Sequence, residues 1–177
     1  MVKQIFIING SGGSGKDTFV ALVSKFIPTM NFSSVDKVKE VARMIGWTGE
    51  KTERDRKFLS DLKLLCTDYN EMPMNSMAEK VEKFLKSDYY EFLFLHIREP
   101  KEIDKAKEAF NAKTILVKRD SVLHITSNMA DANVYNYDYD IVIDNSGSLD
   151  ELDSKALALV LEFEEDYLDN RIKNNNI

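Results

Sequence analysis

The segment from Gly10 to Thr18, Gly-Ser-Gly-Gly-Ser-Gly-Lys-Asp-Thr, combines a flexible backbone with a positive charge. It follows a largely apolar run at residues 4–8 and leads into a helix-like stretch at residues 18–23. A strand, a tight glycine-rich loop and a helix in this order are the context in which G-x-x-x-x-G-K (the Walker A pattern) marks a phosphate-binding loop. A flexible Gly/Ser linker is the alternative, but a linker rarely lies between a buried strand and a helix. The pattern therefore predicts a nucleoside triphosphate site.

The chemistry of such a loop comes from its backbone and from one side chain. Glycines permit backbone angles at which successive N–H groups face one concavity, and the positive end of the following helix adds attraction for anions. Lys16 can reach the β- and γ-phosphates as a point charge. We expect the phosphates of ATP to be bound by Gly12, Gly13, Ser14, Gly15, Lys16, Asp17 and Thr18.

One residue departs from the usual motif. The lysine is normally followed by Ser or Thr, whose hydroxyl ligates Mg²⁺. This chain has Asp17 there and places the hydroxyl one residue later, at Thr18. A carboxylate can hold the hard Mg²⁺ ion directly or through water, which makes Asp17 and Thr18 candidate metal residues. Alternatively, Asp17 only favours the helix dipole from the first turn.

Length, charge and composition limit the function classes. A chain of 177 residues fits one domain, 1–177. A net charge of −6 and a pI near 5.1 argue against a surface that coats nucleic acid. The single cysteine, Cys66, excludes an intramolecular disulfide and is expected at a buried helical position. Because we find neither a signal sequence nor an apolar run of membrane-spanning length, we expect a soluble, cytoplasmic protein with no membrane partner.

Strand signals alternate with helix signals along most of the chain. We expect strands at 3–8, 31–35, 91–97, 114–117 and 140–143, and helices at 17–26, 36–46, 52–69, 76–87, 100–110 and 148–167. Five strands interleaved with helices predict a mostly parallel sheet with helices on both faces, the α/β class. The helical block 36–89 is too long for one crossover, so we expect a helical flap near the site. Residues 174–176 are expected to form a frayed tail.

Arg98 is the strongest candidate for holding an acceptor. It follows the apolar run 91–97, and ligands of open α/β sheets bind at the carboxyl ends of the strands. The forked donors of arginine match a phosphate bidentately. An ion pair with Glu99 or a helix carboxylate is the alternative.

The helical block offers further substrate-binding candidates. Asp36 could cap a helix or meet the acceptor's sugar or base, and Lys39 could meet a phosphate. Arg56, Ser60 and Lys63 lie on neighbouring turns of one helix, where they face either the acceptor or solvent. Three alternating tyrosines before the last strand are expected to be wall or surface residues rather than a base-stacking box: Tyr135, Tyr137 and Tyr139.

With these residues in view, the chain resembles the nucleoside monophosphate kinase group of P-loop proteins. It is similar to the phage-type deoxynucleoside monophosphate kinases and related small-molecule kinases. The likeness rests on the Gly-Lys-Asp-Thr element at 15–18, on Ile-Arg-Glu-Pro at 97–100, and on the last strand and closing helix at 143–152. The resemblance implies a three-layer P-loop NTPase fold, an acceptor-binding region at about 31–89 and a lid at about 118–134.

The chain also departs from the family it resembles. Those kinases often place Asp two residues before the arginine, where it helps to organise Mg²⁺, whereas this chain has His96. Imidazole suits softer metals, so we expect His96 to be structural or a hydrogen-bond donor near the phosphates, with Asp17 supplying the carboxylate. In the lid, Arg119 is expected to meet the transferring phosphoryl group, with Lys118 beside it. His124 and Asn128 are the remaining polar candidates there.

These expectations combine into one leading hypothesis and two alternatives. The leading one is an Mg²⁺·ATP-dependent phosphotransferase for a small phosphorylated acceptor, a nucleoside or deoxynucleoside monophosphate. Lys16, Arg98 and Arg119 are its expected catalytic residues. The first alternative is a kinase for another metabolite, such as dephospho-coenzyme A, and the second is a non-catalytic nucleotide-binding regulator. The sequence predicts no oligomeric state.

Overall fold

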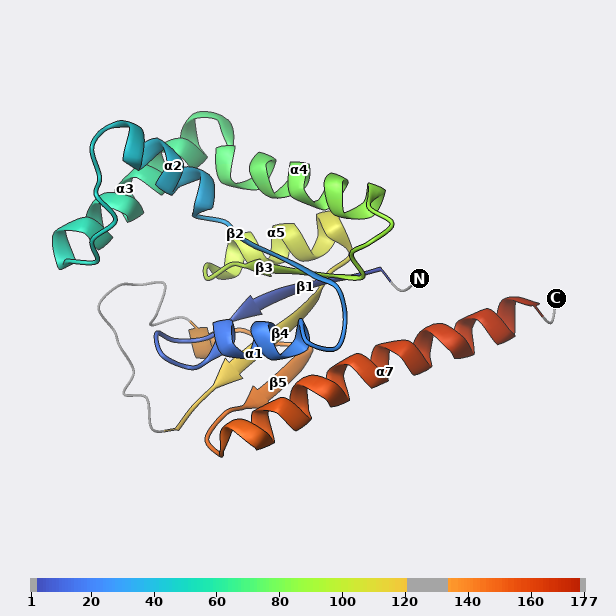
Figure 1. The fold of residues 1–177 in the computed structure, drawn as a ribbon. Coiled ribbons are helices and arrows are strands. Elements are labelled where there is room, and N and C mark those ends of the chain that lie inside the picture. Colours follow the sequence, from blue (N-terminus) through green and yellow to red (C-terminus); the bar gives the residue numbers. More distant parts are fainter. Residues whose placement is uncertain (1–2, 121–133, 176–177) are drawn as a thin grey trace. The chain divides into compact units, whose positions relative to one another are not determined.

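A five-stranded sheet is the centre of the described part of the chain, residues 3–120 and 134–175 of the computed structural model (Figure 1). Its strand order is β2-β3-β1-β4-β5. The strands are β1 (Gln4–Asn9), β2 (Thr29–Ser33), β3 (Phe92–His96), β4 (Lys113–Lys118) and β5 (Ile141–Asp144). The pairs β1–β3, β1–β4 and β4–β5 are parallel, which confirms the predicted α/β class.

The three inner strands explain the unbroken apolar runs in the sequence. Strands β3, β1 and β4 are buried along nearly their whole length, whereas the edge strands β2 and β5 are only partly buried. A strand covered by helices on both faces must be apolar at every position, because neither face meets water. The parallel arrangement also brings the carboxyl ends of β1, β3, β4 and β5 to one edge of the sheet, where the candidate residues follow.

Helices cover the two faces of this sheet (Figure 1). Helices α1 (Lys16–Val23) and α7 (Leu149–Asn175) contact each other on one face, and α5 (Pro100–Phe110) packs against β1 and β4 on the other. Phe6 is fully buried between α7 and the sheet. Its ring centroid lies 5.1 Å from Phe94 and 5.0 Å from Phe163. Each such buried phenylalanine stabilises the fold by roughly 1.5–3 kcal/mol.

The chain divides into two compact units, which we call the sheet unit (Met1–Asn31 and Ser87–Ile177) and the helical unit (Phe32–Lys86). The helical unit contains α2 (Asp36–Met44), α3 (Glu53–Asn70) and α4 (Met72–Lys86). Helix α3 begins with a capping box between Thr52 and Asp55. The chain's single tryptophan, Trp47, follows α2, and the Arg43 guanidinium lies 5.5 Å from its ring centroid.

Three details differ from the sequence prediction. Helix α4 begins at Met72 rather than near Ser76, because Pro73 occupies the first turn, where a missing N–H breaks no helical hydrogen bond. Helix α7 continues to Asn175, so the predicted frayed tail was wrong for 174–175. No glycine or proline follows Gly147 to end this helix. Cys66 is half-buried rather than buried, and it lies on α3, which is described over its whole length and contains no buried residue.

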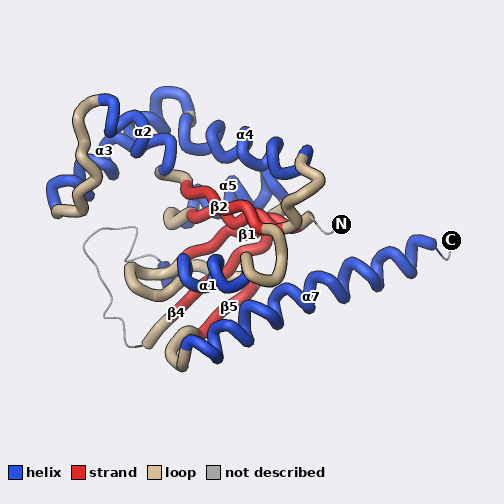
Figure 2. The backbone as a smooth tube through the Cα atoms, in the orientation of Figure 1, coloured by secondary structure: helices blue, strands red, loops and turns tan. Residues whose placement is uncertain are grey.

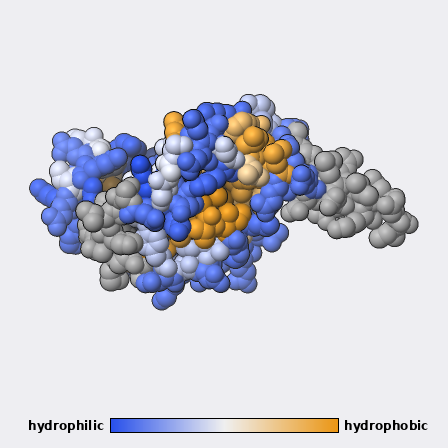
Figure 3. All heavy atoms as spheres, turned by 90° about the horizontal axis from the view of Figure 1, so that it is seen from below, coloured by the Kyte–Doolittle hydropathy of each residue, from blue (hydrophilic) through white to orange (hydrophobic). Residues whose placement is uncertain are grey.

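The surface of the sheet unit is not uniformly polar. Three leucine or valine side chains of α7 and β5 are 39–53% exposed: Leu157, Leu161 and Val142. Figure 3 shows hydrophobic residues gathered in the middle of the face seen from below, with hydrophilic residues around them. Among the described residues, no helix is both long and apolar enough to cross a membrane.

Candidate functional site

The glycine-rich loop connects the carboxyl end of β1 to the amino end of α1 (Figure 2). The Ser14 N–H donates to the Ser11 carbonyl over 3.1 Å, which closes a turn inside the loop. Both serine side chains are buried, whereas Asp17 and Thr18 at the start of α1 are exposed. Helix α1 has Gly15 as its N-cap, and no described side chain caps it. An uncapped helix N-terminus after a glycine-rich turn is the backbone arrangement that binds phosphate.

At two positions of the loop, neighbouring atoms come so close that only glycine fits. A Cβ at Gly10 would lie 2.5 Å from the carbonyl oxygen of Val117 on β4. Gly15 has a left-handed φ of +91°, and its Cβ would lie 2.2 Å from Nδ2 of Asn145. Side chains larger than hydrogen would therefore displace the loop from β4 or from the segment after β5.

A pocket of about 420 Å³ opens beside the loop within the sheet unit. The loop and the start of α1 form one wall, where Gly13, Gly15, Lys16, Asp17 and Thr18 line the pocket. The opposite wall comes from the segments that follow β4 and β5, and consists of Arg119, Asn145, Gly147, Leu149 and Leu152. The structure thus brings five of the predicted loop residues together with Arg119 around one pocket, whereas Gly12 and Ser14 do not line it.

Asn145 connects the two walls of the pocket. Its side-chain Nδ2 donates to the Ser14 carbonyl over 2.9 Å, and its backbone N–H donates to the Lys118 carbonyl over 2.7 Å. It thereby ties the phosphate loop to the ends of β4 and β5. The sequence prediction missed Asn145 and the two pocket leucines. Their position directly after the last strand was the available signal, since strand ends of a parallel sheet meet at one edge.

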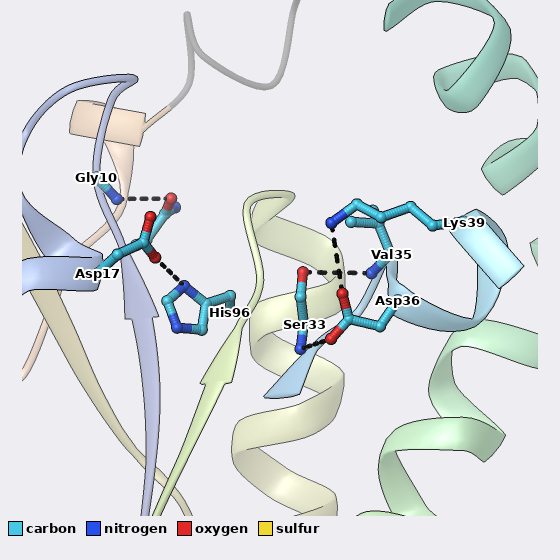
Figure 4. A network of polar contacts seen from close by, with 8 residues as sticks. Gly10, Asp17, Ser33, Val35, Asp36, Lys39 and His96 are labelled. Carbon is cyan, nitrogen blue, oxygen red and sulfur yellow. Dashed lines mark hydrogen bonds and ion pairs between the residues drawn. The ribbon is translucent and has the colours of Figure 1, made fainter. Parts of the chain in front are cut away.

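Asp17 and His96 lie next to each other, as Figure 4 shows. His96 ends β3, and its Nδ1 lies 3.6 Å from Oδ1 of Asp17. The Asp17 side chain is 83% exposed and that of His96 only 13%. The residues that depart from the usual motif are therefore neighbours in space. No group of three or more His, Cys, Asp or Glu side chains suited to a metal occurs among the described residues.

Arg98 follows β3 at the same edge of the sheet as the loop. It is half-buried and does not line the pocket beside Arg119. Its backbone carbonyl accepts a hydrogen bond from Asn9, the last residue of β1. The phosphate loop and Arg98 thus follow neighbouring parallel strands, β1 and β3, at their carboxyl ends.

The remaining acceptor candidates lie in the helical unit, where their ligand roles stay predictions. Oδ2 of Asp36 accepts from the Ser33 N–H over 2.8 Å, and its Oδ1 lies 3.4 Å from the Lys39 ammonium (Figure 4). These contacts stabilise the first turn of α2. On α3, Arg56 is exposed and Lys63 is half-buried. Two further candidates, His124 and Asn128, lie outside the described residues.

The alternating tyrosines attach the segment before β5 to the rest of the sheet unit. This segment begins with the short 3-10 helix η1 (Val134–Asn136). The Tyr135 hydroxyl lies 3.0 Å from Ser11 Oγ in the phosphate loop, and the Tyr137 hydroxyl donates to Asp104 on α5 over 2.8 Å. Tyr139 bonds to Asn9, and burial raises the pKa of its hydroxyl to about 12. None of these tyrosines lines the pocket, and each has a hydroxyl contact with another part of the sheet unit.

Comparison with solved structures identifies the fold. A sugar kinase from Janibacter sp. HTCC2649 is 15% identical, with a TM-score of 0.51 over 89% of this chain and 94% of that one. The tunicamycin resistance protein of Deinococcus radiodurans is 12% identical, with a TM-score of 0.54 over 89% of this chain and 95% of that one. TT1252 from Thermus thermophilus is 19% identical, with a TM-score of 0.53 over 92% and 98%.

These similarities extend over nearly the full length of each chain and confirm the predicted three-layer P-loop fold. At such low identity they establish the fold alone. No protein-family model matches the chain, and no curated protein does.

Proposed function

We propose that this chain is an ATP-dependent phosphotransferase that moves the γ-phosphoryl group to a small phosphorylated acceptor. The proposal rests chiefly on one observation. The uncapped amino end of α1, preceded by the glycine-rich loop, opens into a pocket that Arg119 also lines. On a P-loop kinase fold, this is the arrangement that phosphoryl transfer requires, since the reaction needs positioned phosphates and positive charge more than covalent chemistry.

The pocket suits the donor nucleotide. Its volume of about 420 Å³ lies within the range of roughly 300–1,000 Å³ that is usual for small-molecule sites. The loop N–H groups and Lys16 bind the phosphates. Leu149 and Leu152 offer apolar contacts to the base, and the planar guanidinium of Arg119 can stack on it or reach the phosphates. In this arrangement the phosphates of the donor contact one wall of the pocket and its base contacts the other.

Asp17 and Thr18 would hold Mg²⁺ on the exposed first turn of α1. The ion supplies the positive charge that neutralises the β- and γ-phosphate oxygens during transfer. The carboxylate and the hydroxyl are oxygen ligands, which this hard cation prefers. Nδ1 of His96 lies 3.6 Å from Oδ1 of the Asp17 carboxylate.

Arg98 binds the phosphate of the acceptor in this proposal. It leaves the buried strand β3 beside β1, so its side chain starts from the edge of the sheet that carries the phosphate loop. The acceptor we favour is a nucleoside or deoxynucleoside monophosphate, through the resemblance of the Ile-Arg-Glu-Pro element at 97–100. Asp36, Lys39, Arg56 and Lys63 are its further proposed contacts. Dephospho-coenzyme A or a similar metabolite is the alternative acceptor.

The test is ADP production with Mg²⁺·ATP and a panel of acceptors that includes all common nucleoside and deoxynucleoside monophosphates and dephospho-coenzyme A. Lys16→Ala should lower the rate by about 10²–10³-fold, as the loss of one oxyanion donor does in other enzymes. Lys25→Ala is the matched control, because Lys25 follows the other end of α1 and makes a surface ion pair with Asp153. Equal rates for Lys16→Ala and Lys25→Ala would refute the role of Lys16. ATP binding without turnover on any acceptor would instead support a nucleotide-binding regulator.

A further inference from the structure

Asn9 is a fully buried polar residue that neither the motif nor the pocket accounts for. It ends the central strand β1, directly before the phosphate loop, and is only 1% exposed. A buried amide destabilises a fold unless its donors and acceptor are bonded. Oδ1 of Asn9 accepts from the Gly10 N–H over 2.8 Å. Nδ2 donates to the Tyr139 hydroxyl over 2.8 Å and to the Arg98 carbonyl over 3.2 Å.

The three bonds reach three different parts of the site. Gly10 begins the phosphate loop, and Figure 4 shows its N–H engaged in the bond. Arg98 is the proposed acceptor-binding residue. The register of β1 with β3 ends at Ile8 opposite His96. The Asn9 side chain therefore continues the connection between β1 and β3 beyond their last paired residues, where the segments after both strands lead to the site.

The orientation of the amide is fixed by Tyr139. The Tyr139 hydroxyl donates its only proton to the Val134 carbonyl over 2.9 Å. It can then only accept from Asn9, so the NH₂ group must face it and the oxygen must face Gly10. Burial raises the pKa of Tyr139 to about 12, so this hydroxyl keeps its proton at neutral pH. An asparagine held in this way gives one fixed distance between the loop and the backbone of Arg98.

We propose that Asn9 is a positioning residue that sets the spacing between the donor-phosphate loop and Arg98, with Tyr139 holding its amide in place. The inference rests on the proposed phosphotransfer. In-line transfer needs the donor and acceptor phosphates in one geometry, and a displacement of about 1 Å can lower the rate by roughly 10²-fold. Asn9 acts on this geometry through the backbone, without touching either substrate.

The hydrogen bonds of Asn9 determine which variants test this proposal. Asn9→Ala removes the connection between Gly10 and Arg98. Tyr139→Phe keeps the ring and the apolar packing but removes the hydroxyl that orients the amide. Tyr137→Phe is the matched control, because this neighbouring tyrosine bonds to Asp104 on α5 instead, and its ring lies 5.0 Å from that of Tyr139.

Each variant is assayed for ATP affinity by calorimetry, for thermal unfolding, and for the ratio of acceptor phosphorylation to ATP hydrolysis. Tyr139→Phe and Asn9→Ala should bind ATP within about threefold of wild type, while kcat for transfer falls by about tenfold or more. The fraction of ATP lost to water should rise, since the γ-phosphate stays bound while the acceptor is misplaced. Tyr137→Phe should have the same ratio of acceptor phosphorylation to ATP hydrolysis as wild type.

Two outcomes overturn the inference in distinguishable ways. If Tyr139→Phe keeps the turnover of wild type and has the same transfer ratio as Tyr137→Phe, the positioning role is refuted. The proposed phosphotransferase activity would be unaffected by that result. A loss of transfer that only parallels the loss of ATP affinity or of thermal stability would do the same. Absence of transfer by the wild-type protein to any acceptor would refute the proposed function, and the role of Asn9 with it.

Discussion

Replacing Gly15 by alanine should disturb the phosphate loop in two separable ways. The φ of +91° places the new residue in the left-handed region, which costs an L-residue roughly 1–2 kcal/mol. The Cβ would also lie 2.2 Å from Nδ2 of Asn145. Asn145 must then move and lose its 2.9 Å bond to the Ser14 carbonyl, which costs about 1 kcal/mol. The expected loss in free energy of unfolding is therefore roughly 2–3 kcal/mol.

Thermal unfolding followed by circular dichroism measures this loss. For a chain of this size, roughly 2–3 kcal/mol corresponds to a decrease in Tm of about 4–12 °C. ATP affinity should fall as well, because Gly15 is the N-cap of the helix that holds the phosphates. Asn145→Ala alone removes the bond without the collision. The double variant Gly15→Ala/Asn145→Ala should therefore lose less stability than the two single variants added together.

Gly49→Ala is the control for backbone strain. Gly49 has a similar φ of +96°, but nothing lies within 4 Å of its added Cβ. This variant should lose roughly 1–2 kcal/mol of its free energy of unfolding, because the left-handed backbone conformation is strained but no atoms collide. Its ATP affinity should stay the same. The reasoning is wrong if Gly15→Ala keeps the Tm and ATP affinity of wild type, or if its effects add fully to those of Asn145→Ala.

Two further predictions concern charged residues of the sheet unit. Arg98→Lys should raise the KM of the acceptor by about tenfold or more with unchanged ATP affinity, because lysine cannot bind phosphate bidentately; equal KM values in the acceptor titration would contradict this. Although burial raises the pKa of Asp140, hydrogen bonds from Lys107 and Thr114 hold it below its ordinary value. Asp140 therefore stabilises the fold above its unfolded pKa of about 3.9, and this contribution is lost as pH falls through the lower folded value. Asp140→Asn should be less stable than wild type in urea at neutral pH, with the difference shrinking below about pH 4; a constant difference would exclude this linkage.

The fold could be predicted largely because its strongest signals are local. The inner strands are apolar throughout, and Gly10 to Lys16 follows the first of them directly. Helix ends were harder to place, as α4 shows. A proline in a first turn and a proline that separates two helices look the same in sequence, and only the backbone bonds of the fold distinguish them.

The site could be predicted on one side only. The loop wall of the pocket is one continuous motif, whereas the opposite wall combines Arg119 with residues after β5, including Asn145. Asn9 was missed for a different reason. At the end of an apolar strand it looks like an ordinary boundary residue, and its role depends on partners 89 and 130 positions further along the chain. Such contacts are set by strand order, which residue spacing does not encode.

The single tryptophan gives this protein an optical probe that needs no label. Trp47 belongs to the helical unit, and the sheet unit contains no indole at all. Emission excited selectively from tryptophan therefore reports one location, beside the Arg43 guanidinium. A change in that emission when a nucleotide is added would therefore show that binding alters the surroundings of Trp47 in the helical unit.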